Sequence, residues 1–124
     1  INHHDGLWQG FARNDIEVVI DLDSLTSIKK LGISFLQNQG AWIFFPKNVR
    51  FEVSVDGTDY KLVQNKEYEV TKSPEILFRN VNANYDGNPI RYIKVTARNQ
   101  PILPSWHPAQ GNAAWLFADE VVIQ

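Results

Sequence analysis

Aromatic and histidine side chains gather in two short segments of the sequence where they could bind a ligand. The first segment runs His3-His4-Asp5, and the second carries Trp106 and His107 between prolines near the C-terminus. Proline-rich loops stay at the protein surface, so we expect the Trp106 indole to be exposed. An exposed indole suits a sugar, because one face of a pyranose is apolar while nearby polar side chains can bond its hydroxylated rim.

The other tryptophans need separate interpretations, because large aromatic side chains are more often core residues than ligand contacts. Trp115 sits in an apolar run near the C-terminus, which predicts a core position. We expect Trp8 to lie in the core or to anchor a loop. Trp42 follows the polar residues 37–41, so its indole could face either the core or the solvent.

The three histidines do not have the spacing of a zinc site. His3 and His4 are adjacent, which is awkward for two ligands of one ion, and no His-x-x-x-His pair is present. We therefore expect His3, His4 and His107 to hydrogen-bond either a ligand or the loop backbone.

The carboxylates do not form a catalytic set. Successive residues of a strand point to opposite faces, so Asp119 and Glu120 cannot flank one bond together. Asp21 and Asp23 share a face, but they lie where a strand ends in a turn, and aspartate is common there. The sequence has neither a Ser/His/Asp spacing nor a glycine-rich phosphate loop. We predict that this chain alone is not an enzyme.

Composition limits the classes of partner. The 124 residues, 44% of them hydrophobic, predict a single globular domain spanning residues 1–124. A net charge of -2 argues against a nucleic-acid partner and, less strongly, against anionic membrane surfaces. Cysteines are absent, and no apolar run approaches the roughly 20 residues of a transmembrane helix. Because the sequence begins at Ile1, we expect a domain excised from a longer protein.

Alternating apolar and polar residues predict an all-β chain. Val49, Phe51, Val53 and Val55 alternate with polar residues, and the pair Asp56-Gly57 that follows is a strong hairpin signal. No segment keeps a helical period for three turns, and residues 99–112 form a long loop with three prolines. Short strands separated by turn signals predict an antiparallel β-sandwich. Further strands are expected at 16–22, 30–37, 60–63, 76–81, 90–98 and 116–123.

An ordered set of short motifs covers nearly the whole chain. The motifs are Asp5-Gly6-Leu7-Trp8-Gln9-Gly10-Phe11, Val19-Ile20-Asp21-Leu22, Trp42-Ile43-Phe44-Phe45-Pro46, Glu52-Val53-Ser54-Val55-Asp56-Gly57, Arg91-Tyr92-Ile93-Lys94-Val95 and Ala114-Trp115-Leu116-Phe117-Ala118-Asp119-Glu120. The set resembles the F5/8 type C (discoidin-like) family, which includes the family 32 carbohydrate-binding modules. The Trp-His-Pro loop and the C-terminal motif look like those of C-terminal domains in Bacteroides-type β-N-acetylhexosaminidases (chitobiase-like, glycoside hydrolase family 20).

The resemblance implies a jelly-roll sandwich of the galactose-binding-domain-like kind, with the ligand held in loops at one end. Those loops correspond here to a first loop that carries His3 and His4, a middle loop at 37–42 and a loop at 106–111, and together they are expected to form one site. Gln37 and Asn38 stand where many relatives have a sugar-reading arginine, so a galactose preference does not carry over. The implied carbohydrate-binding residues are His3, His4, Gln37, Asn38, Trp42, Trp106 and His107.

The resemblance also implies a structural calcium ion. Many relatives hold calcium with oxygens near the chain start and a glutamate on the last strand, which correspond to Asp5 and Glu120 here. Carboxylate and carbonyl oxygens suit this hard cation.

The function that follows is a non-catalytic module that directs an attached glycoside hydrolase to glycans with terminal galactosyl or N-acetylhexosaminyl sugars. We expect the parent protein to be bacterial and secreted, periplasmic or displayed on the outer surface, and the isolated domain to be monomeric. One alternative is an architectural domain that packs on the catalytic domain without binding sugar. Another is a protein- or membrane-adhesion module, which would need apolar loop tips ringed by basic residues rather than the polar loops present here.

Overall fold

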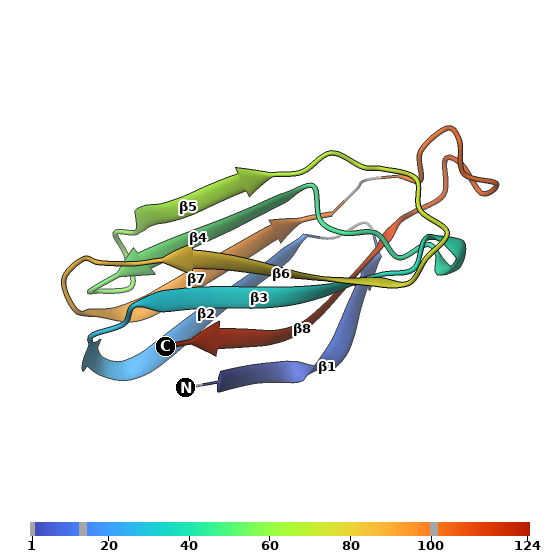
Figure 1. Cartoon of the computed structure of the whole chain (residues 1–124). Coiled ribbons are helices and arrows are strands. Elements are labelled where there is room, and N and C mark those ends of the chain that lie inside the picture. Colours follow the sequence, from blue (N-terminus) through green and yellow to red (C-terminus); the bar gives the residue numbers. More distant parts are fainter. Residues whose placement is uncertain (1, 13–14, 100–101) are drawn as a thin grey trace.

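The computed structural model describes the backbone of residues 2–12, 15–99 and 102–124, and the side chains of residues 15–99, 102–118 and 121–124. Almost all regular structure in this part of the chain is β-strand (Figure 1). The elements are β1 (Asn2–Ala12), β2 (Ile16–Thr26), β3 (Lys30–Gln37), the 3₁₀ helix η1 (Gln39–Ala41), β4 (Asn48–Ser54), β5 (Lys61–Glu67), β6 (Leu77–Asn84), β7 (Ile90–Arg98) and β8 (Trp115–Ile123).

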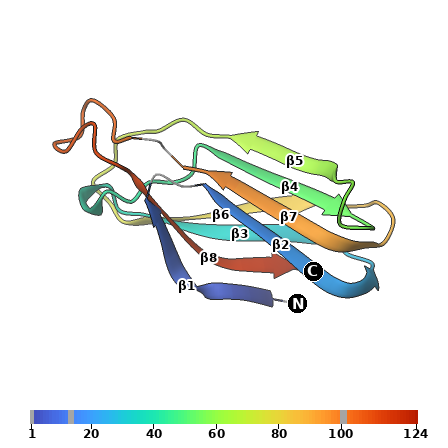
Figure 2. The same cartoon turned by 180° about the vertical axis from the view of Figure 1, so that it is seen from behind.

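The strands form two four-stranded antiparallel sheets that stack face to face (Figures 1 and 2). Sheet A has the order β1-β8-β3-β6, and sheet B has the order β2-β7-β4-β5. Every neighbouring pair of strands within a sheet is antiparallel. The prediction of an antiparallel β-sandwich is therefore confirmed.

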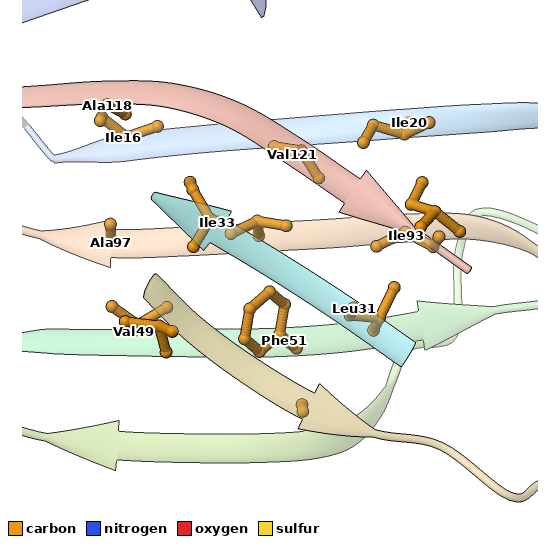
Figure 3. Close-up of a cluster of buried hydrophobic side chains, with 14 of the residues drawn as sticks. Ile16, Ile20, Leu31, Ile33, Val49, Phe51, Ile93, Ala97, Ala118 and Val121 are labelled. Carbon is orange, nitrogen blue, oxygen red and sulfur yellow. The ribbon is translucent and has the colours of Figure 1, made fainter. Parts of the chain in front are cut away.

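The core fills the space between the sheets with apolar side chains from alternate strand positions. Val49 and Phe51 of β4 and Ile93 of β7 are fully buried and meet Leu31 and Ile33 of β3 from the other sheet (Figure 3). The alternation follows from strand geometry, because successive side chains point to opposite faces and only one face of each sheet lies inside.

Most predicted strands agree with the observed ones, and β3 and β7 have the predicted bounds. The segment before residue 13 is the exception, because His3 and His4 were predicted to lie in a loop and instead belong to strand β1 (Asn2–Ala12). Its partner β8 supplies the backbone hydrogen bonds, and the register shifts between His4 and Gln9. This bulge interrupts the alternation of apolar and polar residues by which a strand is predicted from sequence.

One ion pair and one hydrogen-bonded turn lower the pKa values of two aspartates at sheet B. Arg91 Nε donates to Asp21 Oδ1 at 2.8 Å, and this bond, together with a backbone N–H donated by Asp23, lowers the pKa of Asp21. At the turn after β4, the backbone N–H groups of Asp59 and Thr58 donate to Asp56 and lower its pKa. Both aspartates therefore stay ionised and have structural partners.

The predicted hairpin between β4 and β5 is present, and Gly57 gives it its sharp turn. Gly57 has φ +80°, and a Cβ there would lie 3.1 Å from the Tyr92 ring. We expect Gly57→Ala to lower the free energy of unfolding by about 1–2 kcal/mol, because left-handed backbone is costly with a side chain. Gly40→Ala is the matched control, since the nearest atom is 3.6 Å away. Thermal denaturation that shows equal losses for the two variants would contradict this account.

Candidate functional site

Three segments gather at one end of the sandwich, where sequence reasoning placed the ligand loops. They are η1, the connection between β5 and β6, and the loop at 102–114 that leads into β8 (Figures 1 and 2). The two termini lie together away from this end in both views. The loop cluster is therefore built from the middle and the late part of the chain.

His3 and His4 do not belong to the loop cluster. They lie on β1, where His3 pairs with Val121 and His4 pairs with Glu120. The loop at 102–114 instead enters β8 at Trp115, whose β1 partner is Ala12. At about 3.4 Å per residue, His3 is about 20 Å along the sheet from that entry point. The prediction that the His3-His4 segment lies beside the Trp106 loop is wrong, although the first and last segments do pair.

Gln39 and His107 tie the three segments together. Gln39 Nε2 donates to the carbonyl of Thr71 at 2.7 Å, and Gln39 Oε1 accepts from the Ser73 N–H at 2.9 Å. His107 Nε2 lies 2.7 Å from the carbonyl oxygen of Gln39. The N–H of Ala109 donates to His107 Nδ1 at 3.0 Å. Since Nδ1 accepts from Ala109, the Nε2 side of the ring is the donor to the Gln39 carbonyl.

Two of the predicted sugar ligands are used inside the fold. His107 is 7% exposed, and both of its ring nitrogens bond to backbone. Gln37 is 6% exposed, and its Oε1 accepts from the N–H of Phe45 at 3.3 Å. The prediction that these side chains face a sugar is corrected, because both side chains are buried and bond to backbone groups of the fold. Asn38 remains available: it is half-buried, and its side-chain amide bonds to no residue in the described part of the chain.

Removal of the His107 ring is expected to destabilise the loop cluster. His107→Ala leaves the Ala109 N–H without a partner and leaves the Gln39 carbonyl with the Trp42 N–H alone, which costs about 1–3 kcal/mol of unfolding free energy. His107→Asn is the matched variant, because its amide oxygen can replace Nδ1 while the Nε2 contact is lost, and it should fall between wild type and alanine. Urea denaturation measures both. A His107→Ala protein as stable as wild type would show that the two bonds contribute nothing.

Trp106 is a partly buried anchor rather than an open platform. Its ring packs against a second hydrophobic cluster formed by Phe44, Leu103 and Ala114. The centroids of the Trp106 and Phe44 rings are 6.1 Å apart. Lys72 Nζ lies 5.9 Å from the Trp106 ring centroid. The loop is on the surface as predicted, but part of the Trp106 indole packs against this cluster and holds the loop in place.

Trp42 and Trp115 are two exposed tryptophans at this end whose backbones are hydrogen-bonded to each other, and they are named here the tryptophan pair. They are 36% and 38% exposed, and the N–H of Trp115 donates to the Trp42 carbonyl at 2.8 Å. Trp115 also packs edge-on against Phe117, with ring centroids 6.2 Å apart. Trp42 was predicted to face either way, and it faces solvent. Trp115 was predicted to be core, which is wrong because its neighbours Leu116 and Ala118 take the inward positions of β8.

The backbone at Trp42 has an unusual conformation. Trp42 follows η1 with φ 68° and ψ 18°, in the left-handed region that bulky residues rarely adopt. Its N–H donates to Gln39 and its carbonyl accepts from Trp115, so hydrogen bonds on both sides hold it there. Such conformations persist where the surroundings fix them, and they concentrate at binding and active sites.

The predicted metal ligands lie outside the described side chains. Among the side chains that the structure does describe, no group of three His, Cys, Asp or Glu residues could hold an ion. The backbone register nevertheless pairs His4 with Glu120, so Asp5 follows directly after the partner of Glu120. The β1 bulge between His4 and Gln9 lies at this same place.

Searches against known proteins gave structural matches alone. No family model and no curated protein matches the chain. In the described residues, no helix is long and apolar enough to cross a membrane. The K2 cleaved adhesin domain of Lys-gingipain aligns with 89% of this chain and 63% of its own length at 10% identity, with a TM-score of 0.52, which shows a shared fold.

Two further structures match with lower TM-scores. The C-terminal domain of a chitobiase from Bacteroides fragilis aligns over 90% of this chain and 66% of its own, at 18% identity and a TM-score of 0.47. CBM32-3 from a family 31 glycoside hydrolase of Clostridium perfringens aligns over 95% and 74%, at 14% identity and a TM-score of 0.47. The chain thus spans 63% to 74% of the length of these three structures. The two-sheet topology and the fold shared with the adhesin domain confirm the predicted sandwich.

Proposed function

We propose that this chain is a non-catalytic carbohydrate-binding module whose tryptophan pair binds a terminal galactosyl or N-acetylhexosaminyl sugar. The observation that carries the proposal is the juxtaposition of Trp42 and Trp115, both more than a third exposed and joined by a 2.8 Å backbone hydrogen bond. Exposing two large indoles to water is unfavourable, and a sugar whose apolar face covers them would remove that apolar area from water.

The chemistry of the surroundings agrees with a neutral, hydroxylated ligand. Asn38 begins the turn that presents Trp42, and its amide can donate to and accept from sugar hydroxyls. The buried bonds of Gln39 and His107 hold η1 against the 102–114 loop, so little ordering remains to be done when the ligand binds. A shallow site of this kind is expected to bind with about 4–6 kcal/mol, which corresponds to millimolar to high-micromolar affinity.

The setting of the module is also part of the proposal. From the sequence resemblance, we infer attachment to a bacterial glycoside hydrolase that is secreted, periplasmic or displayed on the outer surface. The module would hold that enzyme on its glycan, and the catalytic residues would lie in the parent protein. As an isolated domain it is expected to be monomeric.

The calcium site, with Asp5 and Glu120 as ligands, is proposed from the sequence resemblance. Calcium saturation is expected to raise the melting temperature by several degrees, since an ion at 100 times its Kd adds about 2.7 kcal/mol to the stability of the folded state. Glu120→Gln should remove the effect, and magnesium should not reproduce it because it demands a tighter octahedral geometry. A melting temperature unchanged by chelator would exclude the ion.

A glycan array on the isolated chain tests the proposed function. Retention of glycans that end in galactose or N-acetylhexosamine, lost in the Trp42→Ala variant, supports it. If the folded wild-type chain retains no glycan, the domain packs on its neighbour as an architectural element instead.

A further inference from the structure

A second surface with ligand chemistry lies on the outer face of sheet A. Asn80, Asn82 and Asn84 occupy alternate positions of β6 and are all exposed. The facing residues of β3 are Ser34, Gly32 and Lys30, paired with them in that order. A hollow of about 510 Å³ lies between these strands and extends to Val122 and Gln124 at the end of β8. We name this hollow the asparagine groove.

The residue types in the groove work against strand formation. Asparagine and glycine are both depleted in strands, yet three asparagines and one glycine share this face. Gly32 also sets the depth of the hollow. A Cβ at Gly32 would lie 2.6 Å from Asn82 Oδ1, so a side chain there would displace the Asn82 amide from its place over β3. A strand glycine of this kind often marks the close approach of another group or a ligand.

The amides of the groove have hydrogen-bonding capacity to spare. Ser34 Oγ donates to Asn80 Oδ1 at 2.7 Å. This bond does not use the Asn80 amino group, which can still donate to a ligand. Within the described part of the chain, the side-chain amides of Asn82 and Asn84 make no hydrogen bond. Alternate strand positions are about 6.8 Å apart, so the three amides extend over roughly 13 Å. They form a row of donors and acceptors that is longer than one sugar ring.

The charge of this face distinguishes it from the opposite face. Lys30 is the one charged side chain among the described residues that line the groove. The hollow on the outer face of sheet B, in contrast, is lined by Lys47, Arg50, Arg98, Glu67 and Glu69. Mixed charges are typical of a solvated surface, whereas a neutral row of amides suits a neutral partner rich in hydroxyl or amide groups.

An aromatic side chain stands at one end of the groove. Phe78 precedes Asn80 on the same face of β6 and is 67% exposed. Its β3 partner is Leu36, which in turn pairs with Phe117 of β8. An apolar row therefore crosses the sheet at this end of the line of amides. We propose that the asparagine groove is a binding site for an extended neutral oligosaccharide chain, with the amides bonding its hydroxyl or acetamido groups and Phe78 contacting one ring face.

This site goes beyond the terminal-sugar site and does not depend on it. Sheet A would hold internal units of a chain, and the tryptophan pair would hold an end. The volume of the groove lies within the roughly 300–1,000 Å³ common for small-ligand sites. A chain that contacts the whole row should bind more tightly than any of its single units, because each added unit brings further hydrogen bonds without a new loss of translational freedom.

Nuclear magnetic resonance titration of the full chain with chitohexaose, cellohexaose and N-acetylglucosamine tests the proposal. A hexasaccharide is expected to shift the side-chain amide signals of Asn80, Asn82 and Asn84, and the monosaccharide is not. Asn80→Ala/Asn82→Ala should weaken hexasaccharide binding by about tenfold or more, since each lost bond is worth a few-fold in affinity. Gly32→Ala, which displaces the Asn82 amide, should weaken it in the same direction.

Controls separate this site from the tryptophan pair. Asn65→Ala removes an amide from sheet B and should leave hexasaccharide binding unchanged, and Trp42→Ala should remove terminal-sugar binding while the asparagine signals still shift. Absence of any shift at the three asparagines with both hexasaccharides overturns the proposal. So does wild-type affinity in the double variant. Shifts at these signals that grow with protein concentration alone, without sugar, would assign the face to a second copy of the chain and overturn it too.

Discussion

Alanine at both Trp42 and Trp115 is expected to abolish detectable binding of a terminal sugar and to leave the fold intact. Each exposed indole should contribute about 1.4 kcal/mol to binding through the apolar area that the sugar covers, which is a tenfold change in Kd. If the two losses add, a millimolar affinity falls by about a hundredfold, below the range of titration. Because both rings are more than a third exposed, the stability cost should stay near about 1 kcal/mol per substitution.

Trp106→Ala is the matched tryptophan control for that experiment. Trp106 packs on Phe44 in the second hydrophobic cluster, so its loss should lower the melting temperature while sugar binding is retained. Isothermal titration with methyl galactoside and N-acetylglucosamine, together with thermal melts of the same samples, gives both quantities. The opposite pattern, with binding lost in Trp106→Ala and kept in the double variant, would place the site in the 102–114 loop.

The strands could be predicted from sequence because their cause is local. Each strand of the sandwich has one inner and one outer face, so the period of two in residues such as Val49, Phe51 and Val53 is written directly in the sequence. The hairpin at Asp56-Gly57 is equally local, since φ +80° at Gly57 is a property of two or three residues. Strand β1 was not predicted because its bulge depends on pairing with β8, more than 100 positions later in the chain.

The candidate site was harder to predict, because residue type does not reveal whether a polar atom is already used. His107 has the chemistry of a ligand contact, but the Gln39 carbonyl and the Ala109 N–H, which lie on two different segments, occupy both of its nitrogens. Trp115 was within reach of sequence reasoning. Leu116 and Ala118 are inward, and the same alternation that predicted the strand places Trp115 on the outer face.

The largest loss of stability in this part of the molecule is expected from Phe44→Ala. Phe44 is completely buried, and its ring centroid lies 6.1 Å from that of Trp106 and 6.0 Å from that of His107. Replacing a buried phenylalanine by alanine costs about 3–5 kcal/mol, from the lost transfer free energy and the cavity that remains. For a domain of this size, that loss lowers the melting temperature by roughly 10–20 °C.

The position of Phe44 between the main core and the 102–114 loop makes the effect diagnostic. The second cluster is small, so its other members, Leu103 and Ala114, cannot close the cavity. Hydrogen exchange should therefore become faster at Leu103 and His107, whose N–H groups are bonded within the loop. Phe78→Ala is the matched control, because the same atoms are removed from a ring that is 67% exposed, and its cost should stay below about 1 kcal/mol. If the two phenylalanine variants melt at the same temperature, the second cluster does not hold the loop. The rigid support inferred for the tryptophan pair would then have to come from the hydrogen bonds of Gln39 and His107 alone.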